Sequence, residues 1–207
     1  MKTLINTFSR YTGAALVLGS AFSFVQPVMA DVNSQVLEAQ VTHEIQAPIG
    51  LHWGEKKSDL HATRCSVDNF ETCAINPDTK LPFAEQYYGV FDKESHELVK
   101  VVIFGKDITE DPDGTKGKAE FNQYKNQLIH TYGQPAANFE RVGMSVYDDS
   151  NQFYQCLKYM DCGYYTAGFG QDQGTVSLVL KGLDAGKGYL KMVYQSTEFY
   201  EILDQSS

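Results

Sequence analysis

Apolar and polar residues alternate along the last third of the chain, and this pattern predicts antiparallel strands. Residues 175–181 and 189–195 place apolar side chains at every second position and are separated by a glycine-rich turn. A period of two is typical of a strand with one buried face. We therefore expect these two segments to pair, and residues 141–147 and 163–169 to add further strands to the sheet.

An earlier pair of strands is predicted at residues 87–91 and 98–104. Both segments are rich in β-branched and aromatic residues, and the polar sequence 92–95 between them has turn-forming character. This arrangement is typical of a β-hairpin.

The clearest helix pattern covers residues 118–132, where apolar side chains recur every three or four positions. Gly133 and Pro135 follow directly and form a strong stop signal. A short terminal helix is predicted at residues 197–204. Together these elements predict one compact α+β domain, in which an antiparallel β-sheet carries one long amphipathic helix on a face and disulfides add stability.

The segments before the hairpin have weaker patterns. Residues 49–54 are interpreted as a short strand, residues 55–64 have helical character, and residues 65–82 are interpreted as a loop. Residues 31–48 are predicted to be an N-terminal arm, with a first strand or helix as the alternative. The domain is therefore expected to span residues 49–207.

The N-terminus has the three parts of a bacterial secretory signal. Lys2 and Arg10 give a positive start, residues 13–25 are apolar, and small residues precede a cleavage point after Ala30. The apolar stretch is too short to span a membrane stably, although an uncleaved anchor is the alternative. With residues 1–30 removed, we expect a periplasmic or extracellular bacterial protein that has no membrane span.

The net charge of the chain indicates which classes of partner it can bind. The whole chain carries a net charge of −9, and removal of two basic residues with the signal changes this value to −11. Nucleic acids and anionic membranes are bound by basic surfaces, so this chain is expected to bind neither. A basic protein, such as a cell-wall hydrolase or a toxin, is a favoured partner because opposite charges speed encounter.

Four cysteines lie in the mature chain, and an even number in an oxidising compartment predicts two disulfides. The short spacings favour pairing of Cys65 with Cys73 and of Cys156 with Cys162, although sequence alone leaves three connectivities open. Neither spacing matches the usual pairs of zinc ligands, so a zinc site is disfavoured.

The segment from Cys156 to Cys162 is the most informative feature of the sequence. A small disulfide ring would hold Lys158, Tyr159 and Asp161 rigidly, which lowers the entropic cost of binding. Over these seven residues the segment resembles the rigid cysteine-bracketed loops of periplasmic lysozyme inhibitors, and this resemblance implies contact with a protein. The alternative is a structural loop in which the tyrosine packs inward.

Two further aromatic residues are candidates for binding. Tyr164 belongs to a tyrosine-rich part of the chain, and Trp53, the only tryptophan, lies beside a turn glycine. Such side chains suit protein or glycan contacts because they offer a large area and a polar group at low entropy cost. A place in the core is the alternative for both.

Residues 109–120 give one metal hypothesis. When this segment is aligned with an EF-hand loop, Asp111, Asp113 and Glu120 fall at positions that bind calcium. The first ligand position lacks a carboxylate, however. The alternative is an ordinary loop in which Asp113 or Thr115 caps the following helix.

The sequence contains no signature of a catalytic nucleophile, a metal-dependent enzyme or a nucleotide-binding loop. We therefore expect an exported, non-enzymatic binding module, of the inhibitor or immunity type, that acts on another protein. The alternative hypothesis is a small secreted hydrolase without a recognisable motif. Apart from calcium, no cofactor is expected.

Overall fold

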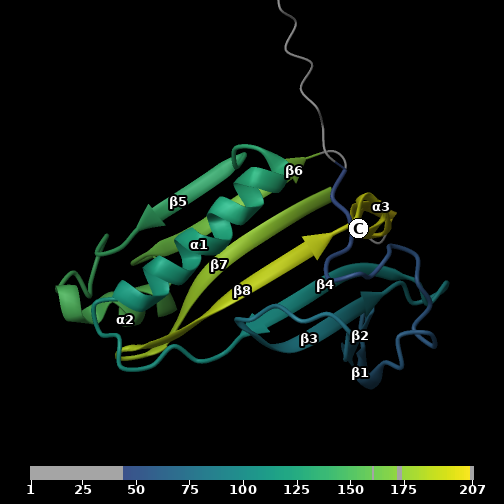
Figure 1. The fold of residues 1–207 in the computed structure, drawn as a ribbon, viewed down its shortest axis with the longest axis horizontal. Coiled ribbons are helices and arrows are strands. Elements are labelled where there is room, and N and C mark those ends of the chain that lie inside the picture. Colours follow the sequence, from purple (N-terminus) through teal and green to yellow (C-terminus); the bar gives the residue numbers. More distant parts are fainter. Residues whose placement is uncertain (1–43, 160, 172–173, 206–207) are drawn as a thin grey trace, which may run out of the picture. The chain divides into compact units, whose positions relative to one another are not determined.

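The computed structural model describes residues 44–159, 161–171 and 174–205. The predicted signal peptide and the predicted arm up to residue 43 lie outside the described residues. Within them, eight antiparallel strands form one sheet in the order β1-β2-β3-β4-β8-β7-β6-β5 (Figure 1). The strands are β1 (Thr63–Val67), β2 (Glu71–Ile75), β3 (Ala84–Phe91), β4 (Leu98–Gly105), β5 (Ala137–Arg141), β6 (Tyr164–Gln171), β7 (Gly174–Asp184) and β8 (Lys187–Gln195).

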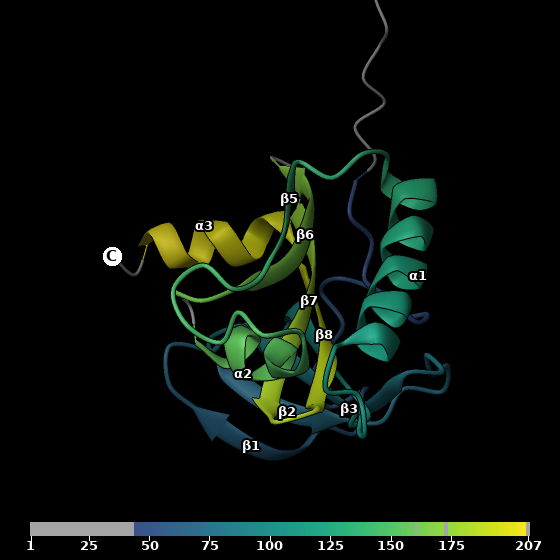
Figure 2. The same cartoon turned by 90° about the vertical axis from the view of Figure 1, so that its left-hand side faces the viewer.

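The described residues also form three α-helices and one short 3-10 helix: α1 (Thr115–Tyr132), η1 (Ser150–Gln152), α2 (Phe153–Lys158) and α3 (Thr197–Gln205). Helices α1 and α3 lie on opposite faces of the sheet, and α2 packs against β7 (Figure 2). The predicted α+β class, the antiparallel sheet and both disulfides are thus confirmed. The prediction of one long helix on the sheet is wrong, because α2 and α3 cover areas that α1 does not reach.

The main core lies between α1 and one face of the sheet. Helix α1 buries Phe121, Tyr124 and Leu128, which are the residues that the helical spacing places on one side. On β7, buried and half-buried residues alternate along Val176–Leu180, as expected for a strand with one buried face. Helix α1 ends at Gly133, whose φ of 81° suits a residue without a side chain and whose N–H donates to the Ile129 carbonyl.

The predicted strands of the last third are found, with one displacement. Strands β6, β7 and β8 confirm three predicted strands, and β7 pairs with β8 in antiparallel register. The strand predicted at residues 141–147 lies earlier, at Ala137–Arg141, as the fully exposed edge strand β5. Residues 142–147 leave the sheet and pass beside the second disulfide.

The segments before the predicted hairpin differ more from the prediction. The hairpin itself is confirmed as β3 and β4. Residues 65–82 are not simply a loop, because they contain most of a β1–β2 hairpin whose first strand is exposed at every position. Residues 49–54 and 55–62 form turns in place of a strand and a helix, and Ile49 and His61 adopt left-handed conformations with φ of 56° and 48°.

The first described residues pack against the core of the domain. Ile45 is buried in the core, and the indole Nε1 of Trp53 donates a 2.7 Å hydrogen bond to its carbonyl. The boundary of the domain at residue 49 stays a prediction. No helix within the described ranges is long and apolar enough to cross a lipid bilayer.

Candidate functional site

Both predicted local disulfides are formed. Cys65 pairs with Cys73 and joins β1 to β2, whereas Cys156 in α2 pairs with Cys162 just before β6. The second disulfide closes the predicted ring from Cys156 to Cys162. The ring begins in helix α2 and ends just before strand β6.

The base of this ring is held by Tyr154, which lies in α2 two residues before Cys156. Tyr154 is completely buried, and its hydroxyl donates a 2.8 Å hydrogen bond to Asp111 Oδ2. Glycines surround it on three elements: a Cβ atom at Gly117 in α1, Gly182 in β7 or Gly188 in β8 would overlap atoms of Tyr154. Burial, together with this hydrogen bond, raises the pKa of the Tyr154 hydroxyl far above its ordinary value of 10. The hydroxyl therefore stays a neutral donor that ties α2 to the start of α1.

Asp111 has a structural role in the same place. The residue is 2% exposed. Its carboxylate accepts hydrogen bonds from the backbone N–H groups of Lys116 and Gly117 at 3.0 and 2.9 Å, and it thereby satisfies donors in the first turn of α1. The negative charge also lies at the positive end of the helix. Both oxygens of Asp111 are thereby occupied by protein donors.

The structure gives the calcium hypothesis no support. Asp113 accepts hydrogen bonds from the backbone N–H and the hydroxyl of Thr115. The predicted cap is wrong in its residue, because the N-cap is Gly114 without a side-chain hydrogen bond, and Asp111 binds the first-turn N–H groups. Burial raises the pKa of the Glu120 carboxyl, and the charge of Lys106 acts in the opposite direction. In the described part of the chain, no three His, Cys, Asp or Glu side chains are grouped so that they could hold a metal ion.

Residues 142–147 pass around the outside of the disulfide ring. The backbone N–H of Met144 donates to the Cys162 carbonyl at 3.0 Å, and the Ser145 hydroxyl donates to the Asp161 carbonyl at 3.2 Å. The N–H of Gly143 also approaches Cys156 Sγ at 3.0 Å. These contacts fix the segment and the ring to each other.

Five exposed apolar side chains gather where this segment meets the ring, and we call them the ring patch. Their exposed fractions lie between 37% and 54%. Tyr147 and Tyr159 stack on each other, with ring centroids 5.7 Å apart and ring planes 11° from parallel. The ring patch consists of Val142, Met144, Val146, Tyr147 and Tyr159.

Most of the predicted binding residues lie at this place. Tyr159 is 48% exposed, Lys158 and Asp161 are exposed beside it, and Tyr164 is exposed at the start of β6. Trp53 is not brought to the ring, because it packs against the core next to Ile45. Residues 142–147 were not predicted to contribute to binding, because their alternating apolar side chains are typical of a strand.

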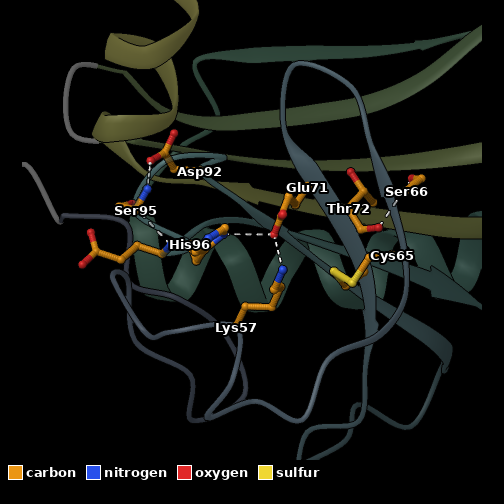
Figure 3. A network of polar contacts seen from close by, with 10 residues as sticks. Lys57, Cys65, Ser66, Glu71, Thr72, Asp92, Ser95 and His96 are labelled. Atoms are coloured by element: carbon orange, nitrogen blue, oxygen red, sulfur yellow. Dashed lines mark hydrogen bonds and ion pairs between the residues drawn. A yellow bond between two sulfur atoms is a disulfide. The ribbon is translucent and has the colours of Figure 1, made fainter.

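The side chains that most resemble a catalytic acid–base pair lie away from the ring, around Glu71 of β2 (Figure 3). Glu71 accepts a hydrogen bond from Lys57 Nζ and lies 3.3 Å from His96 Nδ1. The Lys57 hydrogen bond lowers the pKa of the Glu71 carboxyl, with a smaller contribution from His96. Among the contacts of the described residues, no hydroxyl or thiol group is hydrogen-bonded to His96. The geometry therefore supports a tie between strand β2, the loop of Lys57 and the β3–β4 turn of His96, and the described part of the chain offers no nucleophile at this place.

Comparison of the chain with protein-family models, with curated proteins and with solved structures returned no match.

Proposed function

We propose that this protein is an exported, non-enzymatic binding module that holds a protein partner through the ring patch. The observation that supports this proposal is the group of five exposed apolar side chains around a disulfide-closed loop. Single exposed apolar residues are ordinary on protein surfaces. A contiguous group of them is typical of an interaction site.

The rigidity of the ring patch favours binding. The disulfide, the buried Tyr154 and the hydrogen bonds from residues 142–147 hold the surface in one conformation before any partner arrives. Association then needs less ordering of loops and side chains. The stacked pair Tyr147–Tyr159 has the residue type and the rigidity of an interface hot spot.

The charge of the protein favours a basic partner. Asp148, Asp149 and Asp161 are exposed close to the patch, against the exposed bases Arg141 and Lys158, and the whole chain carries a net charge of −9. Opposite charge steers encounter, while the apolar centre supplies the binding energy. An inhibitor or immunity-type protein that acts on a basic cell-wall hydrolase or toxin fits these features.

Export from a bacterial cell is part of the proposal. It rests on the predicted signal at residues 1–30, and two disulfides are typical of an oxidising compartment. An intact mass of the purified protein that begins at Asp31 would support it, and retention of residues 1–30 would contradict it.

A capture experiment tests the proposal. Tagged wild type, Tyr159→Ala and Val67→Ala are used as baits in periplasmic extract of the host. Val67 is the matched control, because it is a 58% exposed apolar residue on β1, at the opposite edge of the sheet. We expect wild type and Val67→Ala to retain the same basic protein, and Tyr159→Ala to lose it. Equal retention by all three baits would contradict the proposal.

A further inference from the structure

The face of the sheet opposite α1 is only partly covered. Helix α3 lies on this face (Figure 2). Its Phe199 stacks on Phe70, with 4.9 Å between the ring centroids. Beside this contact, an open groove of about 450 Å³ runs across β2, β3, β4 and β8. Its walls include four apolar side chains and two lysines: Tyr88, Val90, Val102, Phe104, Lys100 and Lys191.

The two lysines have no acidic partner. The chain has 26 acidic residues, yet none of the ion pairs among the described residues includes Lys100 or Lys191. Their ammonium groups lie over aromatic rings instead, Lys100 at 4.4 Å from the Phe199 centroid and Lys191 at 5.2 Å from the Phe104 centroid. Both side chains are half-buried on the apolar sheet face.

This arrangement opposes folding. Burial lowers the pKa of both lysine ammonium groups, and the charge of Lys191 adds to the effect on Lys100. The charge of Lys181, on the neighbouring strand β7, acts on Lys191 in the same direction. Both ammonium groups contact aromatic rings, but among the described residues neither pairs with a carboxylate, so both remain open to an anionic ligand.

We propose that this groove binds a small amphiphile that carries one carboxylate on an apolar chain, such as a fatty acid anion. The valine and aromatic side chains would contact the chain, and the two ammonium groups would donate hydrogen bonds to the carboxylate. Charge-assisted hydrogen bonds of this kind are the stronger class. The volume of the groove is within the usual range for small-ligand sites, about 300–1,000 Å³.

Charge complementarity favours a small anion over an anionic membrane. The protein is acidic overall, so an extended anionic surface would also meet acidic parts of the molecule. A small ligand in the groove contacts its two lysines and its apolar lining without that repulsion. The proposal is independent of the ring patch, because the groove lies on β2, β3, β4 and β8, whereas the patch lies beyond β6.

Calorimetric titration of the purified protein with decanoate tests the proposal. Decyltrimethylammonium has the same apolar chain with the opposite charge and is the ligand control. Lys100→Met and Lys191→Met keep an apolar side chain without the charge, and Lys187→Met removes an exposed lysine of β8 outside the groove lining. We expect decanoate to bind, the cationic detergent not to bind at this site, and each groove variant to lose about tenfold or more in affinity. The Lys187 variant should bind decanoate as wild type does.

A stability measurement on the same variants separates a binding role from a structural one. Lys100→Met and Lys191→Met should unfold at the same or a higher urea concentration than wild type, because each removes a desolvated charge. Absence of decanoate binding would overturn the proposal, as would equal binding of the cationic detergent or equal weakening by Lys187→Met. Lysine-dependent binding to phosphatidylglycerol vesicles without binding of decanoate would assign the face to a membrane and would also overturn it.

Discussion

The two disulfides close loops of similar length in surroundings of opposite character. The Cys65–Cys73 disulfide spans eight positions and fastens the fully exposed strand β1 to β2, beside the polar network of Lys57, Glu71 and His96 (Figure 3). The Cys156–Cys162 disulfide spans six positions, and both of its cysteines are completely buried. The surface above it is apolar and exposed.

Chain entropy does not explain this difference. Loops of this size each gain about 2–2.5 kcal/mol from closure in the chain-entropy account, so the two disulfides contribute similarly to stability. Strand β1 is an edge strand with a partner on one side only, and the first disulfide joins it to that partner. The second loop already has a buried anchor in Tyr154, and its disulfide also shapes a surface. The comparison indicates that the first disulfide serves the fold, and that the second serves the proposed binding surface as well.

The largest effect on stability is expected at Tyr154, which anchors the second disulfide loop. Tyr154→Ala would leave an unfilled space among α1, β7 and β8 and should cost about 3–5 kcal/mol of the free energy of unfolding. Tyr154→Phe keeps the ring and leaves a buried Asp111 oxygen with one donor fewer, so it should cost about 1–3 kcal/mol. Urea denaturation measures both. A cost for Tyr154→Ala no larger than that of Tyr154→Phe would show that the ring base is not anchored by packing.

Removal of each disulfide tests the comparison itself. The double variants Cys65→Ala/Cys73→Ala and Cys156→Ala/Cys162→Ala should each lose about 2 kcal/mol or more of stability. Only the second should also lose the captured partner, because only that loop carries the ring patch. Denaturation and partner retention are measured on both variants. Equal loss of binding in the two would remove the distinction between the loops.

Much of this fold could be predicted from sequence, and the exceptions have a physical reason. Alternation and helical spacing identified the segments that bury one face, namely β3, β4, β6, β7, β8 and α1. Strands β1 and β5 are exposed at every position, so they lack the alternation that marks a strand. The turns at residues 49–62 depend on left-handed conformations at Ile49 and His61, two residue types that do not signal them.

The candidate site could be predicted only in part. The cysteine spacing located the ring, whereas the sequence left open whether Tyr159 is exposed or packs inward, and the structure shows it exposed. The rest of the ring patch comes from residues 142–147, whose alternating apolar residues imitate a strand. Their exposure results from tertiary contacts with Cys156, Asp161 and Cys162, which no local pattern encodes.

A pH effect is expected at the first loop. The pKa of Glu71 lies below its ordinary value of 4.5 in the folded protein, first because of the Lys57 hydrogen bond. A lowered carboxyl pKa contributes stability that is present above the unfolded pKa and is lost as the pH falls through the folded pKa. Between about pH 6 and about pH 3, wild type should therefore lose more stability than Glu71→Gln. Parallel stability curves for the two proteins would contradict the role of this network.

The smallest effect is expected from calcium. Both Asp111 oxygens accept protein donors, and Asp113 is hydrogen-bonded to Thr115, so added calcium should leave the melting temperature unchanged. A site saturated a hundredfold over its Kd would add about 2.7 kcal/mol to the free energy of unfolding. Thermal denaturation with and without calcium distinguishes these cases. A rise that Asp113→Ala abolishes would restore the calcium hypothesis.

The most direct test of the ring patch is a paired measurement on Tyr159→Ala, with the captured partner as ligand. The side chain is half exposed, so its loss should change the free energy of unfolding by no more than about 0.5 kcal/mol. The same change should weaken partner binding by about 2 kcal/mol or more if Tyr159 is a hot spot. Val67→Ala, at the opposite edge of the sheet, should change neither quantity appreciably. A stability loss of about 3 kcal/mol with unchanged affinity would show that Tyr159 is a packing residue and would contradict the proposed function.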